Sequence, residues 1–344
     1  MKAITLHEHG GIDKFIYEEV PDPLPGAQEV VLRIHAAGVN HVDIDVRNGT
    51  SGIESLQTLP HIPGVDGTGE VVDIGSEVSM WKVGDRVAPH FILSCGSCAN
   101  CRGGRENICS SSRILGLTAW GTYAEKVVVG ERHLVAIPDA VSYIDAAAAM
   151  NPFATAWEAL IITAQLRPGE TILVNGAGGG VGSHAVQVAA LAGARVIAAV
   201  GSAEKARLIK EHGADEVINY EDEALEEGVK RLTNGKGVDV VFECVGGAIL
   251  QSSIKALADG GRIATIGAHA GENVEIDMIE FFRKHISLLG CGRSTREIYA
   301  KVLELMAVGK LKPILHRTFP LVESPEAHAV MESRQFFGRM VLIP

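Results

Sequence analysis

The chain has 344 residues and is predicted to be an α/β protein, with a doubly wound parallel sheet of six strands joined to a β-rich lobe. From about residue 168, six short apolar runs alternate with helical stretches, a pattern typical of parallel strands buried on both faces. Before about residue 140, short strand-like runs are separated by turns rich in Pro and Gly. Four of the six cysteines are also crowded into this earlier half of the chain.

The predicted β-rich lobe rests on the runs EVVLRIHAAG, GTGEVVDIG, DRVAPHFI and YAEKVVV. The tail after about residue 291 contains one helix, IYAKVLELMAVG, and a closing strand, RMVLIP. It is too short to fold alone, so we expect it to return to the first lobe. We therefore assign residues 1–152 with 291–344 to one domain and residues 153–290 to the other.

Composition excludes several classes of function. Hydrophobic residues make up 47% and charged residues 21%, as in a globular enzyme. The net charge of -11 argues against a nucleic-acid groove or an anionic membrane surface, since both recruit Lys and Arg in patches. The first residues, MKAITLHEHGG, lack the apolar stretch of a signal peptide, and we expect a cytoplasmic protein with reduced thiols.

The four clustered cysteines follow the pattern Cys-x2-Cys-x2-Cys-x7-Cys, at Cys95, Cys98, Cys101 and Cys109. This spacing suits a tetrahedral zinc ion, and a shell of four thiolates leaves no open position for catalysis. The sequence therefore predicts one structural zinc ion.

A glycine-rich turn follows the first strand of the second domain. In NGAGGGVG, Gly176, Gly179 and Gly182 lie three apart where a strand passes into a helix. Glycine lets the backbone approach a pyrophosphate, and the helix N-terminus offers free N–H donors. The residues predicted to bind a dinucleotide are Gly176, Gly179, Gly180, Val181, Gly182, Ser202, Lys205, Tyr220, Val245 and Gly267.

The end of the second strand indicates which dinucleotide binds. An NAD enzyme usually carries Asp or Glu there, whereas this chain reads Ala199, Val200, Gly201, Ser202. No carboxylate repels a 2′-phosphate, and Ser202, Lys205 and Tyr220 could donate to it. We predict a preference for NADP(H) over NAD(H), although Ser202 and Lys205 also fit a solvated first helical turn.

The order of β lobe, cysteine loop, dinucleotide-binding unit and returning tail resembles the medium-chain dehydrogenase/reductase superfamily over essentially the whole chain. The resemblance implies a GroES-like lobe and a Rossmann domain. Zinc alcohol dehydrogenases of that superfamily place Cys, His and Cys at three positions where this chain has Asn40, Val65 and Asn151. These three side chains do not form a catalytic zinc site. The segments GVN-x-VD, PG-x-D and NGAGGGVG instead resemble the quinone oxidoreductase branch, which uses NADPH without a catalytic metal. Unlike many members of that branch, this chain keeps the structural zinc loop.

The same resemblance implies roles for individual residues. Asn40, from the GVN motif, would polarise a substrate carbonyl or hold the nicotinamide ribose, and a buried turn residue is the plainer interpretation. His41 would contact a cofactor phosphate or relay a proton, and Thr155, in the segment TAW, would face the nicotinamide. We expect reduction of an activated double bond or a quinone, with a small carbonyl or quinone compound as the substrate.

Two other functions remain open. One is an alcohol dehydrogenase that recruits a second zinc ion through ligands such as Asp66 and His41. The other is an NADPH-binding protein with little turnover. We further expect Arg339 to face solvent, Cys244 and Cys291 to be structural, and the apolar segments VEIDMIEFF and ISLLG to pair two subunits into a homodimer or homotetramer.

Overall fold

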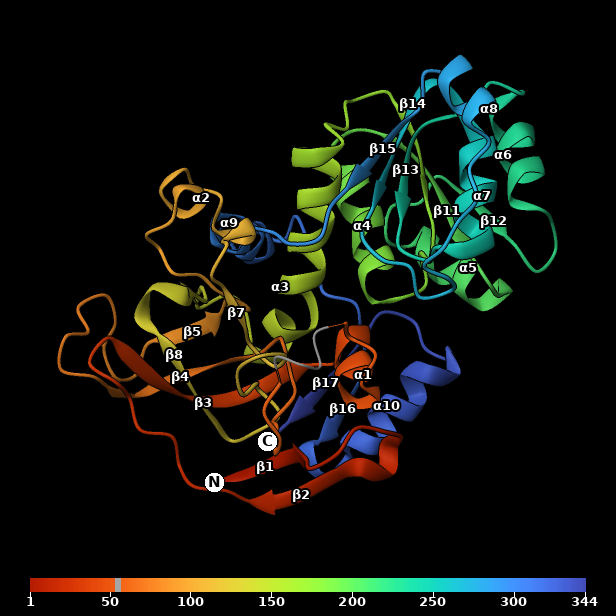
Figure 1. The fold of residues 1–344 in the computed structure, drawn as a ribbon. Helices are drawn as coiled ribbons and strands as arrows, with labels where there is room; N and C mark the ends of the chain where they lie inside the picture. The colour runs from red at the N-terminus through yellow and green to blue at the C-terminus, as the bar shows by residue number, and fades with distance from the viewer. Residues whose placement is uncertain (53–56) are drawn as a thin grey trace. The chain divides into compact units, whose positions relative to one another are not determined.

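The structure is a computed structural model that describes residues 1–52 and 57–344. The chain divides into two compact units, one formed by Met1–Asn151 with Thr295–Pro344 and the other by Pro152–Ser294. The breaks suggested by the sequence were after residues 152 and 290. Both units are shown in Figure 1.

The second unit contains a six-stranded sheet in which every pairing is parallel. The strand order is β12-β11-β10-β13-β14-β15, which is the doubly wound order that reverses direction beside the first strand. This confirms the predicted Rossmann sheet. The strands are β10 (Thr171–Val174), β11 (Arg195–Val200), β12 (Glu216–Asn219), β13 (Val238–Glu243), β14 (Leu257–Thr265) and β15 (Ser287–Gly290).

Helices lie on both sides of this sheet (Figure 1). Right-handed crossovers place successive helices on one face until the strand order reverses, after which they fill the other face. Leu173, Ile197, Val241 and Ile263 from four neighbouring strands are fully buried in one core with α6 and α7. The helices are α4 (Gly180–Leu191), α5 (Ala203–Lys210), α6 (Leu225–Thr233), α7 (Gly247–Ala256) and α8 (Met278–Arg283).

The first unit is built around a seven-stranded sheet. Its longest strand, β3 (Glu29–Gly38), pairs antiparallel with β4, β8 and β17, so the C-terminal tail closes onto the N-terminal lobe as expected. The other strands of this sheet are β4 (Thr68–Ile74), β5 (Arg86–Pro89), β8 (Lys126–Gly130), β9 (Leu134–Ala136), β16 (Leu315–Pro320) and β17 (Arg339–Ile343). Two smaller sheets pair β1 (Lys2–Leu6) with β2 (Phe15–Glu19) and β6 (Ile92–Leu93) with β7 (Arg113–Ile114).

The described part of the first unit also contains four α-helices that lie entirely within it. They are α1 (His41–Asn48), α2 (Ala99–Arg102), α9 (Arg296–Ala307) and α10 (Ser324–Ser333). Helix α3 (Tyr143–Trp157) contains residues of both units and continues as a π-helical segment over Glu158–Thr163. Short 3-10 turns cover Ile12–Lys14, Glu106–Ile108, Glu131–His133 and Leu321–Glu323. Of the helices in the described residues, none has the length and apolar character needed to cross a membrane.

Candidate functional site

The glycine loop of the second unit joins β10 to α4. Gly176 adopts a φ of 62°, in the left-handed region that favours glycine. A Cβ atom on Gly182 would lie 2.2 Å from the carbonyl oxygen of Gly176, so the helix packs against the turn only because residue 182 is glycine. Gly179 caps α4, and the N–H groups of Gly180 and Val181 in its first turn have no acceptor within the helix. This cradle of bare backbone fits the pyrophosphate of a dinucleotide.

The three polar residues predicted to receive a 2′-phosphate lie around the ends of β11 and β12. The Ser202 hydroxyl oxygen accepts a 3.2 Å hydrogen bond from the Lys205 backbone N–H and caps α5. The Lys205 side chain lies over the glycine loop, since a Cβ atom on Gly178 would come within 2.6 Å of Lys205 Cδ. A Cβ atom on Gly201 would come within 2.5 Å of the Tyr220 hydroxyl. The structure thus places Lys205 against the glycine loop, with Ser202 and Tyr220 close to the end of β11.

Sequence reasoning missed a buried carboxylate beneath the loop after β13. Glu243 is fully buried and accepts hydrogen bonds from the backbone N–H of Val245 at 2.6 Å and of Gly246 at 2.8 Å. The Asn175 amide, at the end of β10, donates to the same carboxylate at 2.5 Å. The sequence signal that could have revealed this contact is the position of Asn175 and Glu243, two polar residues at the ends of adjacent buried strands. These bonds fix the turn that carries Val245.

The two cysteines of this unit follow strand ends, as expected. Cys244 Sγ lies 3.4 Å from the carbonyl oxygen of Asn175, and a Cβ atom on Gly267 would lie 3.1 Å from the carbonyl oxygen of Cys244. Burial raises the pKa of Cys244 to about 12 and that of Cys291 to about 11. Both thiols therefore stay protonated near neutral pH and behave as small apolar groups.

The four cysteines of the loop between β6 and β7 point at one another. Their Sγ atoms all lie within 4.8 Å, and the measured pairs are 3.5 to 4.0 Å apart. Zinc bound by four thiolates at roughly 2.3 Å places its sulfurs about 3.8 Å apart, so the spacing fits a zinc ion. Backbone N–H groups of Cys98 and Ser111 point at the sulfurs of Cys95 and Cys109, each at 3.4 Å, and such hydrogen bonds stabilise the thiolates that bind a metal. The set is Cys95, Cys98, Cys101 and Cys109.

Asn40 stands at the start of α1, directly after β3. Its backbone N–H donates to Asp43 Oδ2 at 2.8 Å, which holds the helix start in place. Asp43 is fully buried and also accepts from the Tyr123 hydroxyl at 3.1 Å and from the Val65 backbone N–H at 3.2 Å. Burial raises the pKa of Asp43 to about 6, and the hydrogen bonds from Asn40 and Tyr123 act in the opposite direction.

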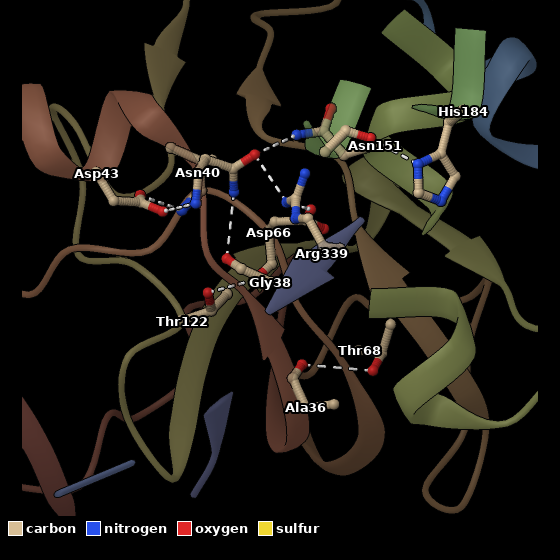
Figure 2. Close-up of polar contacts among 12 residues, drawn as sticks. Ala36, Gly38, Asn40, Asp43, Asp66, Thr68, Thr122, Asn151, His184 and Arg339 are labelled. Atoms are coloured by element: carbon tan, nitrogen blue, oxygen red, sulfur yellow. Dashed lines mark hydrogen bonds and ion pairs between the residues drawn. The ribbon is translucent and has the colours of Figure 1, made fainter. Parts of the chain in front are cut away.

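The side-chain amide of Asn40 lies at the centre of a polar network (Figure 2). Its Oδ1 accepts from Arg339 Nη2 at 2.8 Å and from Asn151 Nδ2 at 3.3 Å. Its Nδ2 donates to the carbonyl oxygen of Gly38 at 3.2 Å. The Tyr299 hydroxyl donates to Asn151 Oδ1 at 2.8 Å and completes the chain. Asn40 and Asn151, which the sequence resemblance placed at two zinc-ligand positions, are therefore joined to each other.

The expectation that Arg339 faces solvent is wrong. Its side chain is 3% exposed and forms a 2.7 Å ion pair with Asp66, which is 1% exposed. Burial raises the pKa of Asp66 above the usual range of a carboxyl group, and the Arg339 guanidinium acts in the opposite direction and keeps the pair ionised. A Cβ atom on Gly38 would come within 2.8 Å of Arg339 Nη2 and 2.9 Å of Asp66 Oδ2, so this pair fits only beside a glycine. Within residues 1–52 and 57–344, the four cysteines are the only group of three or more metal-ligating side chains.

The two other predicted catalytic residues lie in different units. His41 is the exposed first residue of α1, directly beside Asn40 in the sequence. Thr155 lies in α3 within the second unit and is half-buried. The structure thus bonds Asn40 to Asn151 and Arg339, and through Asn151 to Tyr299. Sequence reasoning had linked Asn40 with Asn151 only, as positions without a zinc ligand.

Both units match known protein families. The zinc-binding dehydrogenase model matches residues 180–308, and the alcohol dehydrogenase GroES-like domain model matches residues 26–139. The chain is 30% identical to the quinone oxidoreductase of Sus scrofa over 351 residues, covering 100% of this chain and 98% of the relative. It is 31% identical to an alcohol dehydrogenase of Schizosaccharomyces pombe over 342 residues, covering 99% and 97%.

Among solved structures, one described as an NAD-dependent alcohol dehydrogenase superposes with a TM-score of 0.96 at 39% identity, and the match covers 100% of both chains. A dinucleotide cradle on a Rossmann sheet, together with a GroES-like lobe, defines an oxidoreductase. The chain belongs to the medium-chain dehydrogenase/reductase superfamily.

Proposed function

We propose that this protein is an NADPH-dependent reductase of activated double bonds or quinones, with one structural zinc ion and no catalytic metal. The observation that carries the proposal is that the polar side chains around Asn40 bind one another. Asn40 and Asn151 form a hydrogen bond, and Asp66, the carboxylate that a second metal would need as a ligand, forms an ion pair with Arg339. An unactivated alcohol needs a Lewis acid to form an alkoxide, whereas an enone or a quinone accepts a hydride with a polarised oxygen alone.

The glycine cradle would hold the cofactor pyrophosphate with the backbone N–H groups of Gly180 and Val181. Ser202, Lys205 and Tyr220 would donate to a 2′-phosphate, which supports NADP(H) over NAD(H). The solved structure with a TM-score of 0.96 is described as NAD-dependent, so the preference stands on these three side chains. The reduced nicotinamide supplies a hydride and is itself oxidised.

Asn40 would act on the substrate oxygen. Its Nδ2 carries two hydrogens, and the Gly38 carbonyl takes one. The second would donate to the substrate carbonyl, on which negative charge develops as the hydride adds to carbon. A proton then completes the two-electron reduction, and His41 is its proposed donor. Thr155 would position the nicotinamide.

The test measures NADPH oxidation by the purified protein against a panel of enones, quinones and simple aldehydes, together with zinc per chain by elemental analysis. We expect turnover with enones or quinones and one zinc per chain, lost in Cys95→Ser and kept in Asp66→Ala. Two zinc ions per chain, one of them lost in Asp66→Ala, would replace the proposal by a zinc alcohol dehydrogenase. NADPH binding without turnover across the panel would point to a cofactor-binding protein.

We also propose that the protein is a homodimer or homotetramer. Strand β15 is at one edge of the Rossmann sheet, and α8 before it exposes Met278, Ile279 and Phe282. An unpaired edge beside an apolar helix favours pairing with a second copy. Sedimentation that gives a monomer at micromolar concentration would refute this proposal.

A further inference from the structure

We propose that Arg339 is a positioning residue, which orients the Asn40 amide and strengthens it as a hydrogen-bond donor through a buried charge. In this arrangement the ion pair of Arg339 and Asp66 holds the Asn40 oxygen, while the Asn40 nitrogen would donate to the substrate. The inference rests on the proposed function, because it assigns Asn40 to the substrate oxygen.

The first step concerns the orientation of the amides. A guanidinium has five donors and accepts nothing, so the Asn40 atom 2.8 Å from Arg339 Nη2 has to be oxygen. The Asn151 atom 3.3 Å from that oxygen then has to be the amide nitrogen. The Asn151 oxygen is left facing the Tyr299 hydroxyl, which donates to it at 2.8 Å. Arg339 therefore fixes the direction of every bond in this network, in which the Asn40 side chain also interacts with Asp66.

The second step concerns charge. Arg339 and Asp66 are 3% and 1% exposed, so their charges are poorly screened by water. A cation that donates to the amide oxygen draws electrons away from the amide nitrogen and makes its N–H a stronger donor. Asp66 shares the same guanidinium nitrogen at 2.7 Å and balances the buried charge. Removing either partner alone would leave an uncompensated charge in the core.

The third step is the consequence for the reaction. Negative charge on the substrate oxygen is larger in the transition state than in the bound substrate. A stronger Asn40 donor therefore raises kcat more than it lowers KM.

The experiment is a mutant cycle that removes the ion pair as a unit. Arg339→Gln with Asp66→Asn abolishes both charges at similar volume and is made in the wild type and in Asn40→Ala. In the wild-type background, we expect kcat to fall about tenfold and KM to change less than about threefold. In the Asn40→Ala background, we expect kcat to fall less than about twofold. Arg339→Lys, which keeps the cation, should recover most of the lost kcat.

The matched control removes a second Arg–carboxylate pair, Arg262 with Glu170, which are 19% and 21% exposed and 2.7 Å apart. Arg262→Gln with Glu170→Gln should leave kcat within about twofold of the wild type. An equal loss of kcat in the wild-type and Asn40→Ala backgrounds would overturn the inference, since Arg339 would then not act through Asn40.

A second readout needs no turnover. In NMR spectra of isotope-labelled protein, the Asn40 side-chain N–H signals are identified by their loss in Asn40→Ala. We expect these signals to move upfield when the Arg339 and Asp66 charges are removed, and unchanged signals would contradict the inference. A wild-type enzyme inactive on enones and quinones would refute the proposed function, while the NMR result still decides whether Arg339 polarises the amide.

Discussion

Gly182→Ala is predicted to damage the cofactor loop selectively. The added Cβ atom would lie 2.2 Å from the carbonyl oxygen of Gly176, about 1 Å closer than ordinary van der Waals contact permits. Both atoms are held by backbone, one in α4 and one in the left-handed turn at Gly176, so no flexible side chain relieves the clash. Overpacking of this kind costs about 1–3 kcal/mol. If the loop moves to relieve it, NADPH affinity falls about tenfold for each 1.4 kcal/mol.

The matched control for this prediction is Gly179→Ala. At Gly179 the nearest atom to an added Cβ is again the Gly176 carbonyl oxygen, but at 3.4 Å, and φ is -89°. An alanine is therefore accommodated without strain there. Thermal unfolding and NADPH titration of both variants decide the matter: we expect Gly182→Ala to lose several degrees in Tm, roughly 5 °C, and Gly179→Ala to remain within about 1 °C of the wild type. Equal stability and equal NADPH affinity of Gly182→Ala and the wild type would refute the reasoning.

Three further predictions concern the zinc loop, the cofactor and pH. Cys95→Ser should abolish zinc binding and lower the Tm, because a four-thiolate site contributes directly to folding, whereas Cys291→Ser should keep one zinc per chain by elemental analysis. Lys205→Ala should raise the KM for NADPH about tenfold with little change for NADH in steady-state kinetics; equal changes would remove Lys205 from the 2′-phosphate site. Burial, aided by Arg47, lowers the pKa of His328 to about 3, so the unfolded chain binds a proton there that the folded chain does not as pH falls from about 6.5 to about 3. Stability should therefore fall with pH across that window by up to about 1.4 kcal/mol per unit, and urea unfolding of His328→Gln should show a weaker slope.

The sequence was sufficient for the architecture because its signals are local. Each of the strands β10 to β15 can be predicted from a short run of apolar residues, independently of the rest of the chain. A parallel sheet buried on both faces also has few alternative topologies. The return of the C-terminal tail to the first lobe was predictable for a related reason, although its strand partner was not. A strand and a helix left after the Rossmann unit cannot bury their apolar faces alone, so they have to return to the first lobe.

The candidate site was only partly predictable, because its decisive bonds join distant parts of the chain. Asn40 and Arg339 are 299 positions apart, and Arg339 and Asp66 are 273 apart. An arginine before a terminal strand normally faces water, since the cost of burying an unpaired guanidinium is large. Arg339 is buried because it forms an ion pair with Asp66. No local pattern in the sequence predicts that these two residues are in contact.

Gly38 is the local feature that makes room for this ion pair. An added Cβ atom there would also lie 2.7 Å from the Ala147 carbonyl oxygen, so the residue before the Val39–Asn40 segment has to be glycine for the ion pair to sit beside β3. At the three positions that the resemblance equates with zinc ligands, this chain has two amides, Asn40 and Asn151, which bind each other, and an apolar Val65. A buried polar atom without a partner costs about 1–3 kcal/mol. The two amides and the tyrosine avoid this cost by bonding to one another around Arg339, whereas Asp66 Oδ1 and Arg339 Nε are buried without a hydrogen-bond partner among the described residues. Under the proposed function, this network would hold the Asn40 amide in place to polarise a substrate oxygen without a metal.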